Sequence, residues 1–370
     1  MLASTATVTG QGAPQVDGSV RGGDFSWSQV GTWRGHGHPN EYALGQWLLA
    51  LGWSHRGSTW QRKPLARCDS PSRLHRFEEG KVTRDTTNAQ IMDGTSLARK
   101  LLKDTSERSH RFVARIGRPP CLVAVQVGQD PASMTYARMK RSRCEDAGLD
   151  SRLIQLPTTS TTAQVVGAVR DLSADTTVDG ILLQHPVPSQ VDERAAFEAI
   201  VPEKDVDGVT AHSFAAMALG LPGFAPCTPA GIIRLLDEYD IDPQGMHAVV
   251  IGRSPILGKP VGMLLLARDA TVTYCHSHSS GLPTIVRTAD LVVAAAGHPN
   301  LVKGSWLKPG AVVIDAGYYQ GAAGDVNFRE ALPIASFITP VPGGVGPMTI
   351  ALLLEQTVVA AERRMLTLID

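Results

Sequence analysis

The chain has 370 residues, 43% of them hydrophobic and 19% charged, which is the balance of a folded protein with a sizeable core and excludes disorder throughout. Lysine and arginine together number 35, as do aspartate and glutamate, so there is no overall positive field to attract nucleic acid or an anionic membrane. The five cysteines are scattered and form no C-x-x-C pair, which argues against a disulfide framework and a structural zinc site and favours the reducing cytoplasm.

Residues 1–87 differ from the rest of the chain. They begin with a stretch rich in Gly, Ser, Thr and Ala, and they show almost no periodic pattern. The stretch EYALGQWLLALGW could form a short amphipathic helix, but no neighbouring segment is patterned to cover its apolar face. We therefore predict a largely disordered extension. A transit peptide is less favoured, because repeated arginines on an amphipathic face are missing.

From residue 88 onward, apolar runs of strand length alternate with helical periodicity, which predicts βαβ units around parallel sheets. In chain order we expect a strand at CLVAVQV, a helix at DPASMTYARMKRSRCEDAG, a strand at SRLIQL, a helix at TTAQVVGAVRDLSAD and a strand in DGILLQHPVP. The next helix, CTPAGIIRLLDEY, is expected to have Thr228 as its N-cap and Pro229 at its first helical position.

A second set of units follows, with strands at MHAVVIG, TVTYC, ADLVVAAAG and AVVIDAG and a helix after GKPVG. Ligands of open α/β sheets bind outside the carboxyl ends of such strands. The chain closes with PVPGGVGPMT and a final helix, IALLLEQTVVAAERRM, which is expected to begin after Thr349. The longest uninterrupted apolar runs fall well short of the roughly 20 residues of a membrane helix, so we expect no membrane partner.

A glycine loop follows the first strand of the second set. Gly252, Arg253 and Ser254 come directly after the strand, and Gly258 opens a helix. The spacing is not the G-x-G-x-x-G dinucleotide fingerprint, so a tight structural turn is an equal alternative on glycines alone. Arg253 favours a phosphate ligand, because a guanidinium can pair with it bidentately. Ser277 follows the second strand in a run without acidic residues, which favours NADP over NAD.

Tyr136 and Lys140 are four residues apart and share one face of the predicted helix. A solvated surface is the simpler interpretation of that spacing. A lysine performs acid and base chemistry only if burial or positive neighbours lower its pKa, and nearby arginines act in that direction. Gln184 ends a strongly apolar strand, where its amide either orients a neighbouring amine or simply caps the strand.

Two further stretches carry polar or glycine residues in positions that suit a ligand. Asp205 and Asp207 lie on a turn, where the calcium-loop pattern is not completed and one of them could instead bind a polar heterocycle. The glycines of PVPGGVGPMT allow close approach of the backbone to a ligand, or form a structural turn. The histidines, including His185, show no metal-ligand spacing, so no metal site is expected.

Taken together, these stretches resemble the bifunctional methylenetetrahydrofolate dehydrogenase/methenyltetrahydrofolate cyclohydrolase family. The resemblance runs in order from about residue 88 to 364. It is carried by DGTSLA, DPASMTYARMKR, GILLQHPVP, PEKDVDG, PCTPAGI, VVIGRSPILGKP, ATVTYCHS, GAVVIDAG, GDVNF and TPVPGGVGPMTIALLL.

The resemblance implies an α/β fold with two α/β domains, a cleft between them and a homodimer. An N-terminal folate and catalytic domain would span residues 88–225, an NADP-binding domain of Rossmann type residues 226–345, and a helix over residues 346–370 would return to the N-terminal domain. The implied reactions are oxidation of 5,10-methylenetetrahydrofolate with NADP and hydrolysis of the methenyl product to 10-formyltetrahydrofolate. Tetrahydrofolate derivatives are the expected partners.

Site residues carry over by position. Lys140 resembles the family's catalytic lysine, Gln184 the glutamine that tunes it, and Tyr136 a residue that stacks on or hydrogen-bonds the folate. Asp207 resembles the aspartate that holds the pterin. The expected folate wall and NADP site consist of Pro342, Gly343 and Gly344, and of Gly252, Arg253, Ser254 and Ser277.

The chain departs from the family pattern at two positions. His185 stands where the family usually has leucine after the glutamine, so an imidazole is expected near the reaction site. DAGYY replaces the usual DVGIN, which puts Tyr318 where a smaller residue commonly lines the nicotinamide pocket.

Chain order decides against the first of three rival functions. A short-chain dehydrogenase also uses Tyr-x-x-x-Lys, but its glycine loop precedes the tyrosine, whereas here it follows Tyr136 by more than a hundred residues. A non-catalytic nucleotide-binding module would have lost Lys140 or Gln184, and both are present. A dehydrogenase with little cyclohydrolase activity stays open at this point.

Overall fold

The computed structural model describes the backbone of residues 53–56 and 59–62 together with residues 88–128, 140, 142–319 and 323–366. Two compact units, Met1–Thr83 and Arg84–Asp370, divide the chain. In the first unit, strands β1 (Trp53–Arg56) and β2 (Thr59–Arg62) form an antiparallel hairpin that the sequence did not predict. The rest of the predicted disordered extension lies outside the described residues.

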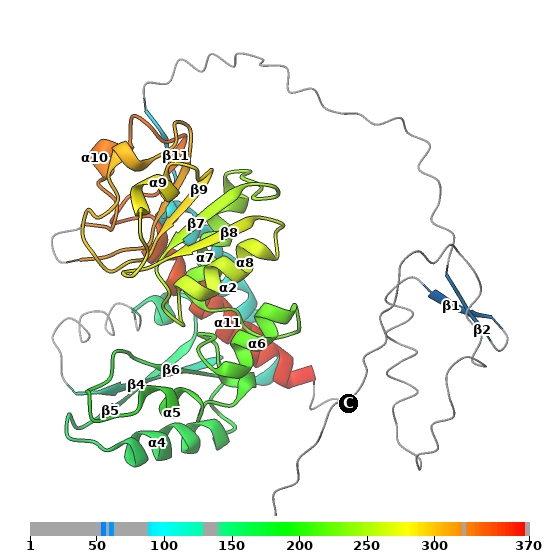
Figure 1. Ribbon diagram of the computed structural model, residues 1–370. Helices are drawn as coiled ribbons and strands as arrows, with labels where there is room; N and C mark the ends of the chain where they lie inside the picture. Colours follow the sequence, from blue (N-terminus) through cyan, green and yellow to red (C-terminus); the bar gives the residue numbers. More distant parts are fainter. Residues whose placement is uncertain are drawn as a thin grey trace, which may run out of the picture. The chain divides into compact units, whose positions relative to one another are not determined.

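Six parallel strands form the larger sheet of the second unit, in the order β3-β11-β10-β9-β7-β8 (Figure 1). Four of them were predicted, whereas the two-residue strands β3 and β11 are too short to give a periodic signal. The strand bounds are β3 Gln90–Ile91, β7 His247–Ile251, β8 Thr271–Cys275, β9 Leu291–Ala294, β10 Val312–Asp315 and β11 Phe337–Ile338. The accompanying helices are α7 (Cys227–Glu238), α8 (Gly258–Leu266), α9 (Leu282–Val286), η3 (Gly304–Trp306) and α10 (Phe328–Ala331).

Three parallel strands form the smaller sheet, in the order β5-β4-β6. Its elements are β4 (Cys121–Val127), β5 (Asp150–Leu156), β6 (Gly180–Leu183), α4 (Thr162–Ala174), α5 (Glu193–Phe197), η2 (Pro202–Lys204) and α6 (Ala211–Leu219). Alternate residues of β4 face opposite sides of the sheet, because side chains alternate along a strand. Val123 and Val125 pack with Val165 and Val169 of α4, whereas Leu122 packs in a different cluster on the other side.

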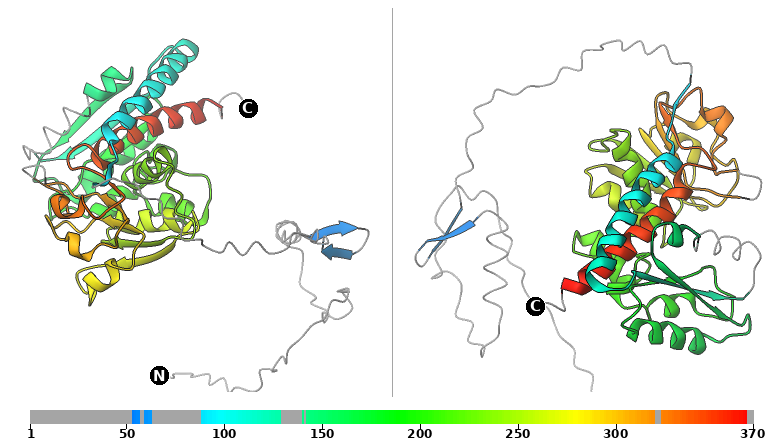
Figure 2. Two further views of the ribbon diagram at one scale, coloured as in Figure 1. Left: turned by 90° about the horizontal axis from the view of Figure 1, so that it is seen from above. Right: turned by 180° about the vertical axis from the view of Figure 1, so that it is seen from behind.

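Helices α2 (Gly94–Ile116) and α11 (Val345–Leu366) connect the two sheets. They lie side by side and run past both halves (Figures 1 and 2). Met348 and Leu354 of α11 belong to one buried cluster that also contains Leu122 from the smaller sheet and Val250 from the larger sheet. Both sheets therefore share one core, and α11 is a central part of it.

Among the helices that the structure describes, α11 is long and apolar enough to cross a membrane by length and composition, over Val345–Met365, and 61% of that window is buried inside the protein. A buried core helix also meets this criterion of length and apolar composition, and α11 is such a helix. Glu355 and Gln356 interrupt the apolar pattern of α11, so the sequence shows no uninterrupted apolar run of membrane length there.

Two predicted helix starts were placed too late. Helix α7 begins at Cys227 with Pro226 as N-cap and without a side-chain capping bond, so Thr228 is not the N-cap. Helix α11 begins at Val345, which places Thr349 inside it. The two threonine hydroxyls instead bond to each other at 2.9 Å and join the two helices near their starts. The two hydroxyls form a tertiary hydrogen bond instead of capping their own helices, and local capping signals cannot predict such a contact.

We expect Leu354→Ala to lower the free energy of unfolding by about 2–5 kcal/mol, because it leaves a cavity in the core that joins the two sheets. Leu354 is fully buried, whereas Leu219, the matched control, is 72% exposed. Urea unfolding should show a change of about 0.5 kcal/mol or less for Leu219→Ala. Equal losses in both variants would contradict the central position of α11.

Candidate functional site

Lys140 and Gln184 meet at the carboxyl end of the smaller sheet. The Lys140 amine donates a hydrogen bond of 3.0 Å to Oε1 of Gln184, and Lys140 is only 9% exposed. Gln184 follows β6 directly, and its backbone N–H bonds to the carbonyl of Val125 in β4. The glutamine is therefore held by the sheet, and it orients the Lys140 amine. From the sequence alone this amine could also have been solvated; in the structure it is buried.

Burial favours the neutral forms of Lys140 and Asp207, so it shifts their pKa values in opposite directions. It lowers the pKa of Lys140, and the negative charge of Asp207 opposes that shift. It raises the pKa of Asp207, opposed by the positive charge of Lys140 and by His185. Neighbouring groups whose charged forms are both disfavoured exchange protons at low cost, as acid and base chemistry requires.

A second carboxylate holds the turn that presents Asp207. Asp205 is fully buried and accepts hydrogen bonds from the N–H groups of Val209 and Thr210, at 3.0 and 2.9 Å, and from the hydroxyl of Ser213 at 2.6 Å. With its lone pairs occupied in this way, Asp205 is a structural residue of the turn. Asp207, two residues along, is the carboxyl group whose negative charge acts on the pKa of Lys140.

Gln356 of α11 supports the same turn from the opposite side. Its amide donates to the carbonyls of Val206 and Ala225, at 2.8 and 3.1 Å, and lies 3.3 Å from the sulfur of Cys227. The Cys227 thiol is buried and also bonds to the carbonyl of Val206. Sequence reasoning missed Gln356, and the only local signal for it is a polar residue in an otherwise apolar helix.

Gln126 is a second residue that the sequence analysis did not single out. It is 2% exposed in β4, and its side-chain amide finds no hydrogen-bond partner within the part of the chain that the structure describes. The β4–β6 register, in which Val125 is opposite Leu183, places Gln126 opposite Gln184 when it is extended by one residue. The two side chains therefore share one face. A glutamine inside CLVAVQV was the available signal.

His185 directly follows Gln184 in the chain, and its expected place beside a reaction site stays a prediction. Its imidazole packs edge-on against Phe197, with the ring centroids 6.1 Å apart. A positive charge on this ring lowers the pKa of Asp207, opposing the effect of burial. Tyr136 lies outside the described residues, so its expected contact with a folate stays a prediction.

Pro342, Gly343 and Gly344 lie against the N-terminus of α2. The backbone N–H of Thr95 bonds to the carbonyl of Gly343 at 2.9 Å. A Cβ atom on Gly94 would lie 1.8 Å from the carbonyl oxygen of Gly344, so this approach of two backbones requires glycine. The glycine-rich turn is thus a fixed surface.

The glycine loop begins at the end of β7, where the strand order of the larger sheet reverses. Strand β7 has β8 on one side and β9 on the other, and this order forms a crevice outside the carboxyl ends. Gly252 has a φ of +137°, and a Cβ atom there would lie 2.1 Å from the carbonyl oxygen of Ala295 after β9. Its N–H bonds to the carbonyl of Cys275 at the end of β8. Only glycine fits this junction of three strands.

Two polar residues of this second site, Arg253 and Ser277, are exposed, whereas Ser254 is half-buried. Arg253 follows Gly252, and Ser277 follows β8, which ends beside β7. The hydroxyl of Ser254 accepts a hydrogen bond of 3.3 Å from the N–H of Ile256 and so shapes the loop. Tyr318 is 76% exposed, and its expected role in a nicotinamide pocket stays a prediction.

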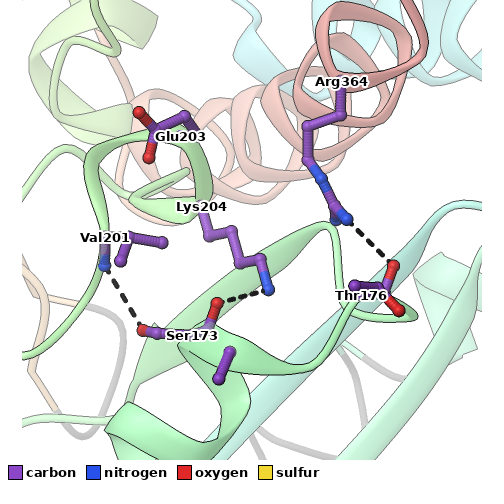
Figure 3. A pocket seen from close by; sticks show the side chains of 7 residues that line it. Ser173, Thr176, Val201, Glu203, Lys204 and Arg364 are labelled. Carbon is purple, nitrogen blue, oxygen red and sulfur yellow. Dashed lines mark hydrogen bonds between the residues drawn. The ribbon is translucent and has the colours of Figure 1, made fainter. Parts of the chain in front are cut away.

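The lining of a surface pocket of about 300 Å³ contains no residue of the two groups described above (Figure 3). The Lys204 amine in it donates to the carbonyls of Leu172, Ser173 and Asp175, at 3.0, 2.8 and 2.6 Å. Three donated bonds use the three N–H groups of an ammonium, so this lysine closes the end of α4 and leaves no donor for a ligand. Within the described ranges, no group of three His, Cys, Asp or Glu residues is placed to hold a metal ion.

Comparison with known proteins identifies similar chains. The family model described as tetrahydrofolate dehydrogenase/cyclohydrolase, catalytic domain, matches residues 92–207. The model described as tetrahydrofolate dehydrogenase/cyclohydrolase, NAD(P)-binding domain, matches residues 226–365. Bifunctional protein FolD 1 of Salinispora arenicola is 64% identical over 275 residues, which are 74% of this chain and 99% of the relative.

Solved structures are similar over the same part of the chain. The bifunctional methylenetetrahydrofolate dehydrogenase/cyclohydrolase of Campylobacter jejuni is 40% identical, with a TM-score of 0.73 over 75% of this chain and 99% of that chain. The methylenetetrahydrofolate dehydrogenase-cyclohydrolase of Trypanosoma brucei, complexed with NADP and an inhibitor, is 34% identical, with a TM-score of 0.71 over 75% of this chain and 99% of that chain.

We expect Gln184→Glu to raise the pKa of Lys140, because it places a negative charge at the 3.0 Å contact with the amine. Gln184→Leu should lower that pKa further, since it removes an acceptor that favours the charged amine. The measurement is an NMR titration of the isotopically labelled lysine side chain in the two variants and the parent protein. A single pKa shared by all three proteins would show that Gln184 does not act on this amine.

Proposed function

The chain belongs to the tetrahydrofolate dehydrogenase/cyclohydrolase family, and we propose that Lys140, Gln184 and Asp207 form its reaction centre. The enzyme oxidises 5,10-methylenetetrahydrofolate to the 5,10-methenyl form with NADP and hydrolyses that product to 10-formyltetrahydrofolate. The observation that carries the assignment of the centre is the 3.0 Å hydrogen bond from the buried Lys140 amine to Gln184.

Lys140 is proposed as the acid and base of the hydrolysis. Burial lowers the pKa of its amine, so more of the neutral form is present at working pH than for a solvated lysine. A neutral amine takes a proton from the water that adds to the cationic methenyl carbon. The resulting ammonium returns a proton to the ring nitrogen that leaves when the ring opens.

Gln184 and Asp207 are proposed to orient the amine and the substrate. The Gln184 carbonyl oxygen fixes one N–H direction of Lys140, which leaves the nitrogen lone pair a restricted set of orientations. The Asp207 carboxyl group would pair with N–H groups of the pterin and is held by the Asp205 turn. Tyr136 is proposed to stack on the folate, next to a wall made of Pro342, Gly343 and Gly344.

Gly252, Arg253, Ser254 and Ser277 are proposed to hold NADP. The backbone at Gly252 supports this assignment, because its positive φ and its contact with Ala295 leave a side-chain-free junction at the crevice. Helix α8 begins at Gly258, directly after the loop and without a side-chain cap, and the positive end of its dipole favours an anion. When bound, NADP accepts the hydride released by the methylene carbon.

The quaternary state and location are also proposals. We propose a cytoplasmic homodimer without nucleic-acid or membrane partners. The equal numbers of acidic and basic residues support the absence of a nucleic-acid partner. Strand β5 is an outer strand of the smaller sheet, and Leu153 on it is 43% exposed, which suits contact with a second copy. Light scattering would give the mass in solution.

The assignment of function is tested in one cuvette. The protein is mixed with 5,10-methylenetetrahydrofolate and either NADP or NAD, and the absorbance of the methenyl form is followed as it appears and decays. Appearance followed by decay, faster with NADP, is the expected result. A methenyl form that accumulates and decays no faster than without enzyme would remove the cyclohydrolase, and no methenyl formation would remove the dehydrogenase.

We expect Lys140→Met to slow methenyl hydrolysis by about 10²-fold or more, because the acid and base group is lost. The thermal midpoint should not fall. Burial lowers the folded-state pKa of Lys140 below its ordinary value of 10.5, so the charged amine opposes folding at neutral pH, and stability from this group rises as pH approaches 10.5.

Lys204→Met is the matched control for that variant. Lys204 is also buried, at 4% exposure, but its amine closes the end of α4. Its loss should lower the thermal midpoint, because three half-buried carbonyls lose their partner, and should leave hydrolysis per folded molecule unchanged. A Lys140→Met enzyme that hydrolyses at the parent rate would exclude Lys140 as the catalytic group.

We expect Arg253→Ala to lower dehydrogenase kcat/KM about tenfold or more with NADP and far less with NAD, because only NADP carries the 2′-phosphate that the guanidinium pairs with. Arg268→Ala is the control: Arg268 is exposed just beyond the C-terminal end of α8 and pairs with Asp237 at 2.9 Å. Proportional losses with both cofactors in Arg253→Ala would mean that this residue does not read the 2′-phosphate.

A further inference from the structure

The carboxylate of Asp325 accepts hydrogen bonds from the backbone of the loop that follows β9. Asp325 is fully buried and accepts hydrogen bonds from the N–H groups of Ala296, Gly297 and His298, at 2.5, 3.2 and 2.9 Å. The Tyr319 hydroxyl donates a fourth bond of 3.1 Å. Three consecutive N–H groups directed at one carboxylate leave the loop little freedom.

That loop forms one side of the crevice in the larger sheet. The N–H of Ala295 bonds to the carbonyl of Ile251 at 2.8 Å, which ties the start of the loop to the end of β7. Ala295 is also the residue whose carbonyl oxygen a Cβ atom on Gly252 would strike. Residues 296–298 therefore continue directly from the wall that meets the glycine loop.

The position of this wall relative to β7 indicates which end of the cofactor it faces. Ser277, assigned to the 2′-phosphate of the adenosine half, follows β8 on one side of β7, and the loop at residues 296–298 follows β9 on the other. A dinucleotide bound across the switch point has its two halves on opposite sides of the central strand. The nicotinamide half consequently lies toward the loop that Asp325 holds.

A second carboxylate fixes Asp325 in turn. Asp315, at the end of β10, accepts hydrogen bonds from the backbone N–H groups of Asp325 and Val326, both at 2.9 Å, and from that of Gly317 at 2.9 Å.

Burial, together with the nearby Asp325 charge, raises the pKa of Tyr319 to about 12. The Tyr319 hydroxyl thus stays protonated and keeps donating at any working pH.

We propose that Tyr319 and Asp325 are a positioning pair that sets residues 296–298 against the nicotinamide half of NADP. Neither residue needs to touch the cofactor, since the Asp325 oxygens are already occupied by four donors. The pair acts on hydride transfer through the placement of the loop. This inference rests on the proposed NADP site at the ends of β7, β8 and β9, and it concerns oxidation rather than hydrolysis.

The test uses Tyr319→Phe in the full chain, assayed separately for the two reactions. Losing one hydrogen bond to a charged acceptor should lower dehydrogenase kcat/KM about tenfold. The loss should be equal with NADP and NAD, because both carry nicotinamide. Hydrolysis of added methenyltetrahydrofolate without NADP should keep the parent rate, because Lys140 lies in the other half of the protein.

Asp325→Asn and Asp290→Asn form a matched pair for the same assays. Asp290 accepts the N–H of His247 at 2.9 Å, at the opposite end of β9 from Asp325. Asp325→Asn should lower oxidation more than Tyr319→Phe does, since an amide NH₂ then faces the loop N–H groups. Asp290→Asn should leave the ratio of oxidation to hydrolysis at the parent value even if it lowers the thermal midpoint.

Three results would overturn the proposal: parent-like oxidation by Tyr319→Phe, an equal fall of oxidation and hydrolysis, or the same selective loss in Asp290→Asn. If Asp325→Asn does not fold, Tyr319→Phe alone decides. A parent protein that fails to oxidise methylenetetrahydrofolate would instead overturn the proposed function. Normal parent activity with an insensitive Tyr319→Phe would overturn only the positioning pair.

Discussion

The burial of a lysine amine beside a carboxyl group is the constraint on which the site depends. Lys140 and Asp207 both pay a desolvation cost for their charged forms, and each partly offsets the cost of the other. Such a pair persists only if its surroundings hold it in place. Gln184 at the end of β6 and the Asp205 turn do so with bonds of 2.6 to 3.0 Å.

The long helix α11 relates this chemistry to the larger sheet. Its apolar residues fill a core shared by both sheets, and its one inward amide, Gln356, bonds to the backbone on both sides of the Asp207 turn. A helix of this kind has to be apolar along most of its length, which explains why its composition also satisfies a membrane criterion. Its burial follows from packing between α2 and α7.

From residue 88 onward, local pattern predicted strands β4 to β10 and helices α4, α7, α8 and α11, but it did not predict the long helix α2 or the short helices α5, α6, α9 and α10. The strands at CLVAVQV, HAVVI and LVVA appear as β4, β7 and β9, because buried parallel strands read as short apolar runs. The two-residue strands β3 and β11 and the starts of α7 and α11 were not predicted correctly. Their extent depends on pairing partners and on a Thr228–Thr349 contact across 121 residues, which no local window contains.

The sequence by itself determined the order of the elements, the family resemblance and the residue types available for chemistry, because these follow from neighbours along the chain. Only the tertiary structure decided that Lys140 is buried and bonded to a glutamine 44 residues away, and that Tyr319 rather than Tyr318 turns toward the Asp325 carboxylate. The physical reason is that burial and hydrogen bonding depend on which segments pack together. The sequence MTYARMK is compatible with either a solvated or a buried lysine, and only the packing of Lys140 near β6 decides between them.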